Sequence, residues 1–454
     1  MNFIAHGIGG VRDLPVPDSF FYTGATVVLA VSFIALGLLW PTPQLERRSG
    51  GRRVAHAFDR VFLSRALRIV VQAFSVLLLG VTLWTALWGT TLTLENFAPT
   101  FIYVAFWLGV PLLSVLFGNV WSVLSPWRAI ADFFVWLLEL GGRQATPLFG
   151  YPQRLGRYPA AVALFSFVAL ELAHPRPGDP RVLGVAVALY TYWALAGMAV
   201  FGRDAWTSGG EGFAVAFGLL ARIAPFTVRE GQIALRWPFT GLAGADHATG
   251  TLAVIAVMLG STSFDGFSRT RIWQDLLTNV REDLVDVPTW RADLTISLFN
   301  VAGLLAFVAA VVVAYLAAMA VAARLVRQPV RSLVPEFLLS LVPIAFAYLL
   351  AHYFSLFLIQ GQFLIPLASD PLGRGWDLFG TAEFQPNYAI VSPETIWYVQ
   401  WLGLVVGHVA GLAIAHDRAV ALFPRRSDAL RSQCPMLVLM VLFTVGGLWL
   451  LNQG

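Results

Sequence analysis

Long apolar segments constrain the fold of this 454-residue chain more than any other feature of its sequence. Windows of about 19 residues locate roughly ten of them, near 20–40, 67–88, 100–124, 158–173, 181–202, 249–264, 293–322, 333–360, 396–416 and 435–452. A helix needs about 20 apolar residues to cross a bilayer, and several segments exceed that length. We therefore predict an all-α, polytopic helix bundle of about ten transmembrane helices, with residues 1–454 forming a single transmembrane domain.

Composition supports this class and excludes others. Hydrophobic residues make up 57% of the chain and charged residues only 12%, which lies outside the range of soluble domains. No clustered basic tract suggests nucleic acid, so no nucleic-acid partner is predicted. The single cysteine, Cys434, allows no internal disulfide and no paired-cysteine zinc site. The first apolar segment has neither a basic start nor a small-residue cleavage site, so we expect it to remain as a helix.

The distribution of arginine predicts the orientation in the membrane. Arginines gather in the loops that follow the first, third, fifth, seventh and ninth apolar segments. The opposite loops, 265–292 and 361–395, contain fewer arginines, mixed with Asp and Glu. Because cytoplasmic loops carry an excess of positive charge, we predict an integral protein of a bacterial-type inner or plasma membrane with both termini on the non-cytoplasmic side. We predict that the protein is embedded in the lipid bilayer. The sequence does not decide whether a membrane or soluble partner subunit also binds it.

Two segments on the arginine-rich side are predicted to be interfacial amphipathic helices. They are 127–140 and 212–224, and each follows a span that ends in a related phrase, FGNVW or FGRDAW. One interpretation is a weak parallel repeat of 67–140 by 158–224. The alternative is two unrelated interfacial helices.

Polar side chains interrupt the apolar segments near one face of the membrane. Glu171 and His174 are three residues apart and so share a helix face. This E-x-x-H pair is used by metal sites in helical bundles, although it equally describes two hydrated residues at a helix end. In the eighth segment, Tyr348, His352 and Ser355 form a polar stripe. An intramembrane histidine is costly unless it has a partner or a task.

Further polar residues occur at a similar depth. Gln400 and His408 lie eight residues apart, on roughly one helix face. The sixth segment ends in GSTSFDGF, which contains Asp265, and Asn300 lies in the first turns of the seventh. We expect these side chains to converge on one outward-opening polar chamber, formed by Glu171, His174, Asp265, Asn300, Tyr348, His352, Gln400 and His408.

Such a chamber could hold a divalent transition metal, because imidazole suits Zn, Cu, Fe or Ni. An open coordination position would then convert bound water to hydroxide near neutral pH. His352 and His408 are candidate ligands, with helix–helix hydrogen bonding, haem ligation and proton relay as the alternatives. His6 could close over the mouth or be a mobile N-terminal residue. For His416, beside Asp417 and Arg418, we favour a cluster that anchors the helix end.

Several sequence phrases resemble those of a known family. They are AHGIGGVRDLPVP, LLWPTP, FGNVWSVLSPWRAIADFF, GSTSFDGF, AYLLAHYFS and GHVAGLAIAHDRA. Over nearly the whole chain the pattern is similar to that of the polytopic membrane proteins called fenitrothion hydrolases. Soluble catalytic signatures such as G-x-S-x-G or a Walker loop are absent from the sequence.

This resemblance implies a metal-dependent hydrolase of organophosphorus triesters that releases a nitrophenol. A small lipophilic substrate would enter the chamber sideways from the bilayer, and a metal-bound hydroxide would attack phosphorus. The metal ligands would be His174, His352 and His408. Asp265 or Glu171 would be a ligand or base, and Tyr348 with Gln400 would orient the phosphoryl group. This hydrolysis could also be a side reaction of another membrane function.

The same residues also fit two other functional classes of membrane protein. The sequence therefore does not decide whether the protein is an enzyme. A transporter or binding protein could take up a metal ion or small solute and pass it toward His416 and the cytoplasmic arginines. The weak repeat favours this class, while the absence of paired broken helices counts against it. Alternatively, His352 and His408 could be axial haem ligands on facing helices in a redox membrane subunit.

Overall fold

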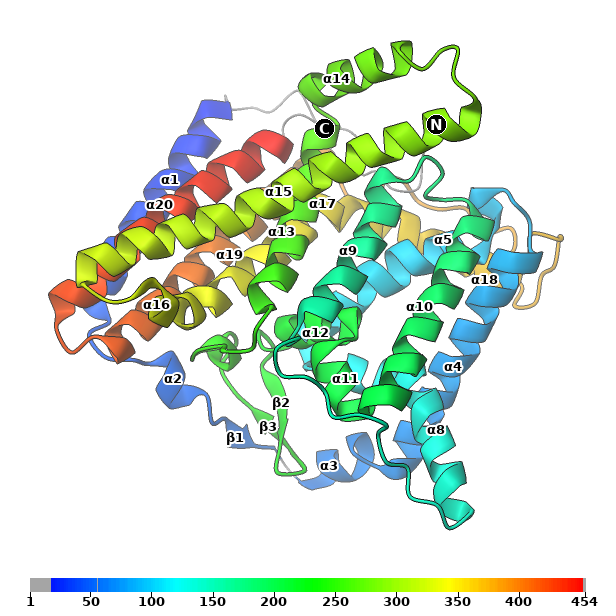
Figure 1. Ribbon diagram of the computed structural model, residues 1–454, viewed down its shortest axis with the longest axis horizontal. Coiled ribbons are helices and arrows are strands. Elements are labelled where there is room, and N and C mark those ends of the chain that lie inside the picture. The colour runs from blue at the N-terminus through cyan, green and yellow to red at the C-terminus, as the bar shows by residue number, and fades with distance from the viewer. Residues whose placement is uncertain (1–17, 55, 452–454) are drawn as a thin grey trace.

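The protein folds into a bundle of long helices, seen here in a computed structural model that describes residues 18–54 and 56–451 (Figure 1). Within those residues, nine helical segments are long and apolar enough to cross a membrane. They are Phe21–Leu39, Arg65–Trp88, Phe97–Phe117, Pro180–Phe201, Thr251–Ser268, Thr289–Val326, Val330–Ser369, Pro393–Leu422 and Arg426–Leu451. A shorter apolar helix, Tyr158–Ala173, corresponds to another of the roughly ten predicted segments. The predicted all-α polytopic bundle is confirmed, and the chain is an integral membrane protein.

Six of these nine segments are complete single helices, the first is part of a single helix, and two are composite. The single ones are α4 (Arg65–Trp88), α10 (Pro180–Phe201), α13 (Thr251–Ser268), α15 (Thr289–Val326), α19 (Pro393–Leu422) and α20 (Arg426–Leu451). The third segment combines α5 (Phe97–Thr100), the π-helix η2 (Phe101–Gly109) and α6 (Val110–Phe117). The seventh combines α16 (Val330–Phe337), η4 (Leu338–Leu341), α17 (Val342–Gln360), η5 (Gly361–Phe363) and α18 (Leu364–Ser369). The first span lies in α1 (Asp18–Leu39), and the short apolar helix is α9 (Tyr158–Ala173).

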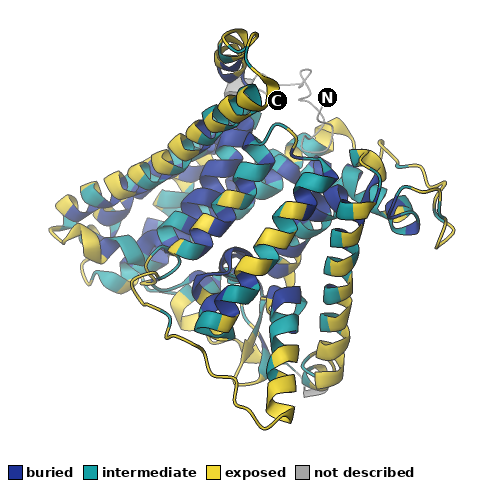
Figure 2. Cartoon of the chain, turned by 45° about the vertical axis from the view of Figure 1, so that its right-hand side comes forward, coloured by how far each residue is buried: buried dark blue, intermediate teal, exposed yellow. Residues whose placement is uncertain are grey.

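The helices form two groups that meet at α9. In one group α1, α15, α17 and α19 pack with α20 or with one another, and α13 joins α15 and α17. In the other group α10 packs on α4 and α8 (Pro126–Leu140). Figure 1 shows these groups on its left and right sides, and Figure 2 shows buried residues inside and exposed residues on the outward helix faces. Exposed apolar faces on long helices are those that lipid would cover.

Glycines allow the closest helix pair in the first group. A Cβ atom at Gly407 of α19 would lie 2.3 Å from the Cβ atom of Ala347 in α17, and one at Gly411 would lie 2.6 Å from the Ser340 carbonyl oxygen. Small residues let transmembrane helices approach until their backbones touch, and this close packing stabilises the pair in the absence of a hydrophobic driving force. The two glycines therefore set the register of α17 on α19.

A small sheet lies on the arginine-rich side, at the bottom of Figure 1, and was not predicted from the sequence. It contains β1 (Arg52–Arg53), β2 (Phe226–Arg229) and β3 (Gln232–Leu235), all antiparallel, in the order β1-β3-β2. The β2–β3 turn has two consecutive residues with positive φ, Glu230 at 53° and Gly231 at 74°. That geometry matches the twist of a two-residue hairpin. The sheet covers the arginine-rich ends of the helices beside α2 (Leu45–Arg48) and α3 (His56–Phe62).

The short helices agree only in part with the two that we predicted. α8 starts where expected, because the Ser125 hydroxyl accepts a hydrogen bond from the Arg128 N–H group and Pro126 occupies the first turn. The segment 212–224 forms α12 (Gly212–Leu220), but its side chains are buried among other helices. Its sequence is apolar on every face, so it has no polar face to lay on a membrane surface. An unpredicted amphipathic helix, α14 (Arg271–Glu282), lies on the opposite side.

The two phrases that suggested a repeat adopt similar local structures. Gly118 ends α6 with φ 96°, and Gly202 ends α10 with φ 87°. Each is followed by a short helix with a buried tryptophan, Trp121 in α7 (Trp121–Leu124) and Trp206 in α11 (Arg203–Gly209). A positive φ suits glycine and lets the chain turn sharply after the span. The repeat over the whole of 67–140 and 158–224 stays a prediction.

A buried polar cluster holds the arginine-rich end of α19. Asp417 Oδ1 accepts hydrogen bonds from the Trp40 indole N–H at 2.9 Å and the Leu45 N–H at 3.0 Å, and Oδ2 accepts one from the Glu46 N–H at 3.0 Å. His416 Nδ1 lies 2.9 Å from Gln433 Oε1 on α20. These contacts join α19 to α2 and α20, as we predicted for a cluster that anchors this helix end.

Candidate functional site

Asp265 is the centre of a buried polar cluster between α13 and α17. Its side chain is 1% exposed. Oδ2 lies 2.7 Å from His352 Nε2 and accepts a 2.9 Å hydrogen bond from the Tyr353 hydroxyl, while Oδ1 lies 3.2 Å from Arg269 Nη2. Arg269 follows Asp265 by four residues and so lies on the same helix face. We call these four residues the Asp265 cluster.

The contact with Asp265 affects which ring nitrogen of His352 donates a hydrogen bond and which one is available to accept a proton. When Nε2 carries a hydrogen it donates to the carboxylate, and Nδ1 is then the basic nitrogen. No residue in the described part of the chain makes a hydrogen bond to Nδ1. A cavity of about 10 Å³, lined in part by His352, Tyr348 and Thr262, lies beside the ring. This volume is close to the smallest that holds one water molecule.

The structure brings three predicted site residues near one another. His352 and Asp265 are in direct contact, and Glu171 is close enough to interact electrostatically with Asp265 and Arg269. Glu171 is 6% exposed and lies on α9, which packs against α13. Two buried carboxyl groups, a histidine and an arginine therefore gather where the two helix groups meet. Such a group inside a membrane protein is rare and usually functional.

The other two predicted metal ligands lie apart from the cluster. His174 follows the last residue of α9, and its Nδ1 accepts a hydrogen bond from the Arg176 N–H at 3.1 Å. His408 is fully buried in α19, with Nδ1 2.7 Å from the Leu404 carbonyl oxygen and no described partner for Nε2.

The predicted metal site does not form from the side chains that the structure describes. In residues 18–54 and 56–451, no three His, Cys, Asp or Glu side chains are arranged to hold a metal ion. His174, His352 and His408 are therefore not brought together, because one caps a helix end and the others have different partners. His6 lies outside the described residues. No step of the chemistry below is assigned to a metal.

The remaining predicted residues have structural partners. The Tyr348 hydroxyl donates to the carbonyl oxygen of Phe443 on α20, although its side chain also lines the small cavity beside His352. Gln400 lines a separate cavity of about 20 Å³ beside Trp401. Asn300 accepts a 3.2 Å hydrogen bond from the Trp273 indole, which fixes α14 on α15. None of the three contacts Asp265 in the described part of the chain.

A much larger cavity, of about 630 Å³, lies in the other helix group. We call it the lateral cavity; α4, η2, α6, α7, α8, α9, α10 and α12 line it. Its lining is mostly apolar, and it includes Val162 of α9 and Leu189 of α10, which are 60% and 65% exposed. Although α9 and α10 are consecutive, each packs mainly on other helices. The cavity therefore opens between them toward the lipid.

The π-helix η2 forms the wall of the lateral cavity opposite this opening. Phe101, Ile102, Ala105 and Phe106 of η2 line the cavity, and in Figure 1 this cyan segment passes behind α9 and α10. A π-helix of nine residues is unusual, because π-turns mostly occur singly and often at functional sites. Hydrophobic periodicity does not reveal one, since the whole segment is apolar.

A polar cavity of about 250 Å³ lies on the arginine-rich side. Arg128, Arg157 and Arg222 line it together with serine, threonine and asparagine side chains, and no Asp or Glu is among the described residues of its lining. We call it the arginine pocket. The order of residues along the chain places these arginines in loops on one side of the membrane, but it does not show that they line one pocket.

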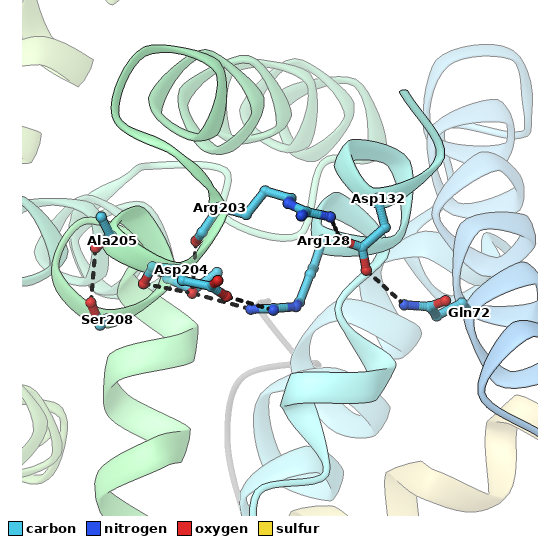
Figure 3. A network of polar contacts seen from close by, with 8 residues as sticks. Gln72, Arg128, Asp132, Arg203, Asp204, Ala205 and Ser208 are labelled. Atoms are coloured by element: carbon cyan, nitrogen blue, oxygen red, sulfur yellow. Dashed lines mark hydrogen bonds and ion pairs between the residues drawn. The ribbon is translucent and has the colours of Figure 1, made fainter. Parts of the chain in front are cut away.

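Two aspartates that are not part of the lining neutralise part of the charge of the three arginines. Arg128 Nη2 lies 2.6 Å from Asp204 Oδ1, and Figure 3 shows this pair next to that of Arg203 with Asp132. Asp246 lies 2.9 Å from Arg157 and 3.3 Å from Arg222. Burial alone would raise the pKa of Asp246, but the two guanidinium groups outweigh it and hold the pKa below its usual value.

Glu211 is a buried residue between the two cavities that the sequence analysis did not select. It caps α12, accepting hydrogen bonds from the Phe213 N–H at 3.1 Å and the Ala214 N–H at 2.7 Å. It also accepts one from Trp121 Nε1 at 3.0 Å and one from the Tyr190 hydroxyl. A lone glutamate directly before the apolar run GFAVAFGLL was the available signal.

No protein-family model matches this chain, and neither a curated protein nor a solved structure matches it. The inference of function therefore depends on three features: the Asp265 cluster, the lateral cavity and the arginine pocket.

Proposed function

We propose that this protein is of the binding or transport class and takes a lipophilic molecule from the bilayer into the lateral cavity. The observation that supports this proposal is a cavity of about 630 Å³ that opens between α9 and α10. Binding sites for small molecules typically have volumes of about 300–1,000 Å³ and mostly apolar walls. We also propose that the arginine-rich side is cytoplasmic, on the basis of the positive-inside rule.

Binding from lipid depends on different forces from binding from water. A ligand that leaves the acyl chains gains little from the hydrophobic effect, so its affinity must come from close packing and a few polar contacts. Aromatic rings on several walls, including Phe106, Trp127, Phe167 and Phe213, provide such packing. We therefore expect selectivity for a molecule with a flat or aromatic body.

Filling the lateral cavity tests this proposal. Ala186 of α10 lines the cavity, whereas Ala188, two residues later, is exposed and does not. An apolar aryl-diazirine photolabel is expected to modify η2 and Trp127 saturably in the wild type and in Ala188→Phe. In Ala186→Phe this labelling should fall at least about tenfold, because the ring occupies the space of the label. Mass spectrometry of the labelled protein provides the measurement. Equal labelling of η2 in all three proteins would exclude the cavity as the binding site.

Hydrolysis of an organophosphorus triester is the second candidate, and the Asp265 cluster is the observation that favours it. In this proposal the helices around the cavity of about 10 Å³ beside His352 must separate to admit the triester, because that volume holds one water molecule only. His352 Nδ1 then removes a proton from the water molecule while Asp265 holds Nε2–H. The water oxygen forms a bond to phosphorus, and the bond to the nitrophenol oxygen breaks, with the electron pair leaving on nitrophenolate. Arg269, with Nη2 3.4 Å from Nε2 and 3.2 Å from Asp265 Oδ1, holds the carboxylate that orients the imidazole.

Release of nitrophenol from fenitrothion tests this second candidate. His352→Ala is expected to lower the rate about 10²–10⁴-fold, the usual contribution of a general base. His174→Gln, at the predicted but separate ligand position, should retain the wild-type rate. Addition of a chelator should have no effect if His352 acts as a base, and should abolish the reaction if it acts as a ligand. A folded wild-type protein that releases no nitrophenol would eliminate the hydrolase.

A further inference from the structure

The lateral cavity and the arginine pocket share one thin wall. Trp121 lines both cavities. Along the chain, Ser125 lines the arginine pocket and Pro126 the lateral cavity, while Phe213 lines the lateral cavity and Ala214 the arginine pocket. Neighbouring residues of the same two segments thus face opposite cavities. One continuous ligand could occupy both spaces if the wall side chain moved.

The two cavities have complementary chemistry. The lateral cavity is almost entirely apolar and opens to lipid, whereas the arginine pocket presents three guanidinium groups, the Asn119 amide and the Ser125 hydroxyl as donors. Asp204 has a side chain that is 84% exposed, and Asp246 lies behind Arg157 and Arg222. Three guanidinium groups against these two carboxylates leave a net positive charge facing the space. Planar guanidinium groups with hydroxyl donors are well suited to the oxygens of a phosphate.

We propose that the ligand is an anionic amphiphile, with a phosphate monoester in the arginine pocket and an apolar chain in the lateral cavity. This inference rests on the proposed function, since it identifies the class of molecule that the lateral cavity binds. A phosphate is favoured over a carboxylate because the donors come from several sides of the pocket, and a phosphate has one more terminal oxygen to accept from them. These donors are the three guanidinium groups, the Asn119 amide and the Ser125 hydroxyl; the hydroxyls of Ser122, Thr207 and Ser208 already donate to backbone carbonyl oxygens.

Trp121 is the side chain that separates the two parts of such a ligand. Its indole N–H donates to Glu211, which is itself held by the N-terminal N–H groups of α12. Movement of the indole breaks that hydrogen bond and its ring contacts with Phe106, Trp127 and Phe217. It leaves the backbone hydrogen bonds that cap α12 in place. The buried Glu211 carboxyl group, at the boundary of the apolar cavity, is shown accepting hydrogen bonds and offers no donor to a phosphate. The phosphate is thereby kept on the arginine-rich side.

Binding of matched octyl compounds to the full-length protein in nanodiscs tests the inference. The probes are octyl phosphate, octanoate, octanol and inorganic phosphate, measured by calorimetry below their micelle concentrations. Octyl phosphate is expected to bind at least about tenfold more tightly than octanol, the effect of one charge-assisted contact. Arg222→Gln and Arg128→Gln should each remove that preference. Arg154→Gln, an exposed arginine outside the pocket, should retain it.

The other outcomes would overturn the inference in distinguishable ways. Equal affinity for octyl phosphate and octanol, with photolabelling of η2 intact, would exclude the anionic head group and leave lipophile binding standing. Equal affinity for octyl phosphate and inorganic phosphate would indicate a site for free anions. Octanoate binding as tightly as octyl phosphate would exclude phosphate selectivity. Absence of saturable photolabelling in the ligand-free wild type, in a preparation that does bind octyl phosphate, would exclude the lateral cavity and the proposed function together.

Discussion

Replacing Asp265 by alanine is expected to lower the free energy of unfolding by about 3–5 kcal/mol, the usual cost of removing one partner from a buried ion pair. The carboxylate accepts hydrogen bonds from Tyr353 and Arg269 and contacts His352, all within the helix bundle. No water in the hydrocarbon region replaces a lost acceptor. The substitution would therefore separate α13 from α17 at the point where their polar groups meet.

Thermal unfolding in detergent measures this effect. Asp265→Asn keeps the volume and one acceptor oxygen, so we expect a smaller loss than for alanine. Asp275→Ala removes an exposed carboxylate on α14 and should change stability by no more than about 0.5 kcal/mol. If Asp265→Ala unfolds at the wild-type temperature, the Asp265 cluster does not stabilise the bundle.

Asp417→Ala is expected to have a comparable effect on the opposite side of the protein. The Asp417 side chain is buried and accepts hydrogen bonds from the Trp40 indole and from the backbone N–H groups of Leu45 and Glu46. Each unsatisfied buried donor costs about 1–3 kcal/mol, and loss of a helix cap about 1 kcal/mol. We therefore expect a total loss of about 3 kcal/mol or more, with α2 released from the end of α19.

Trypsin cleavage provides a local measurement for Asp417. Arg47 and Arg48 lie in α2, so cleavage there should accelerate when α2 detaches from α19. Glu139→Ala, at an exposed carboxylate near the end of α8, is the matched control and should leave the cleavage rate unchanged. Unchanged cleavage in Asp417→Ala would mean that the remaining contacts of α2 hold it without the aspartate.

The transmembrane segments could be predicted because each one is a continuous run of apolar residues, which can be recognised in the sequence without knowing the tertiary contacts. An apolar run long enough to cross lipid must be helical to satisfy its own backbone hydrogen bonds. The predicted segments 181–202 and 249–264 therefore match α10 and α13 to within a few residues, whereas the last segment, 435–452, begins nine residues after the start of α20. The prediction failed for the interfacial position of 212–224, because an apolar run of nine residues fits a buried helix as well as a surface one.

The candidate site could be predicted only in part. Asp265 and His352 were selected because polar groups in apolar segments are costly, and they do lie in contact. His408 was selected by the same argument but bonds to the Leu404 carbonyl oxygen of its own helix. The position of a residue along a span predicts its depth. It does not predict which neighbouring helix the side chain faces.

The sequence by itself determined the fold class, the approximate ends of the spans and the side on which the arginines gather. Each of these follows from the order of apolar and charged residues along the chain and from the thickness of a bilayer. Only the tertiary structure decided that α9 and α10 separate around the lateral cavity and that Arg128, Arg157 and Arg222 surround one pocket. Those features depend on the rotation of each helix about its axis and on close contacts such as Gly407 on Ala347.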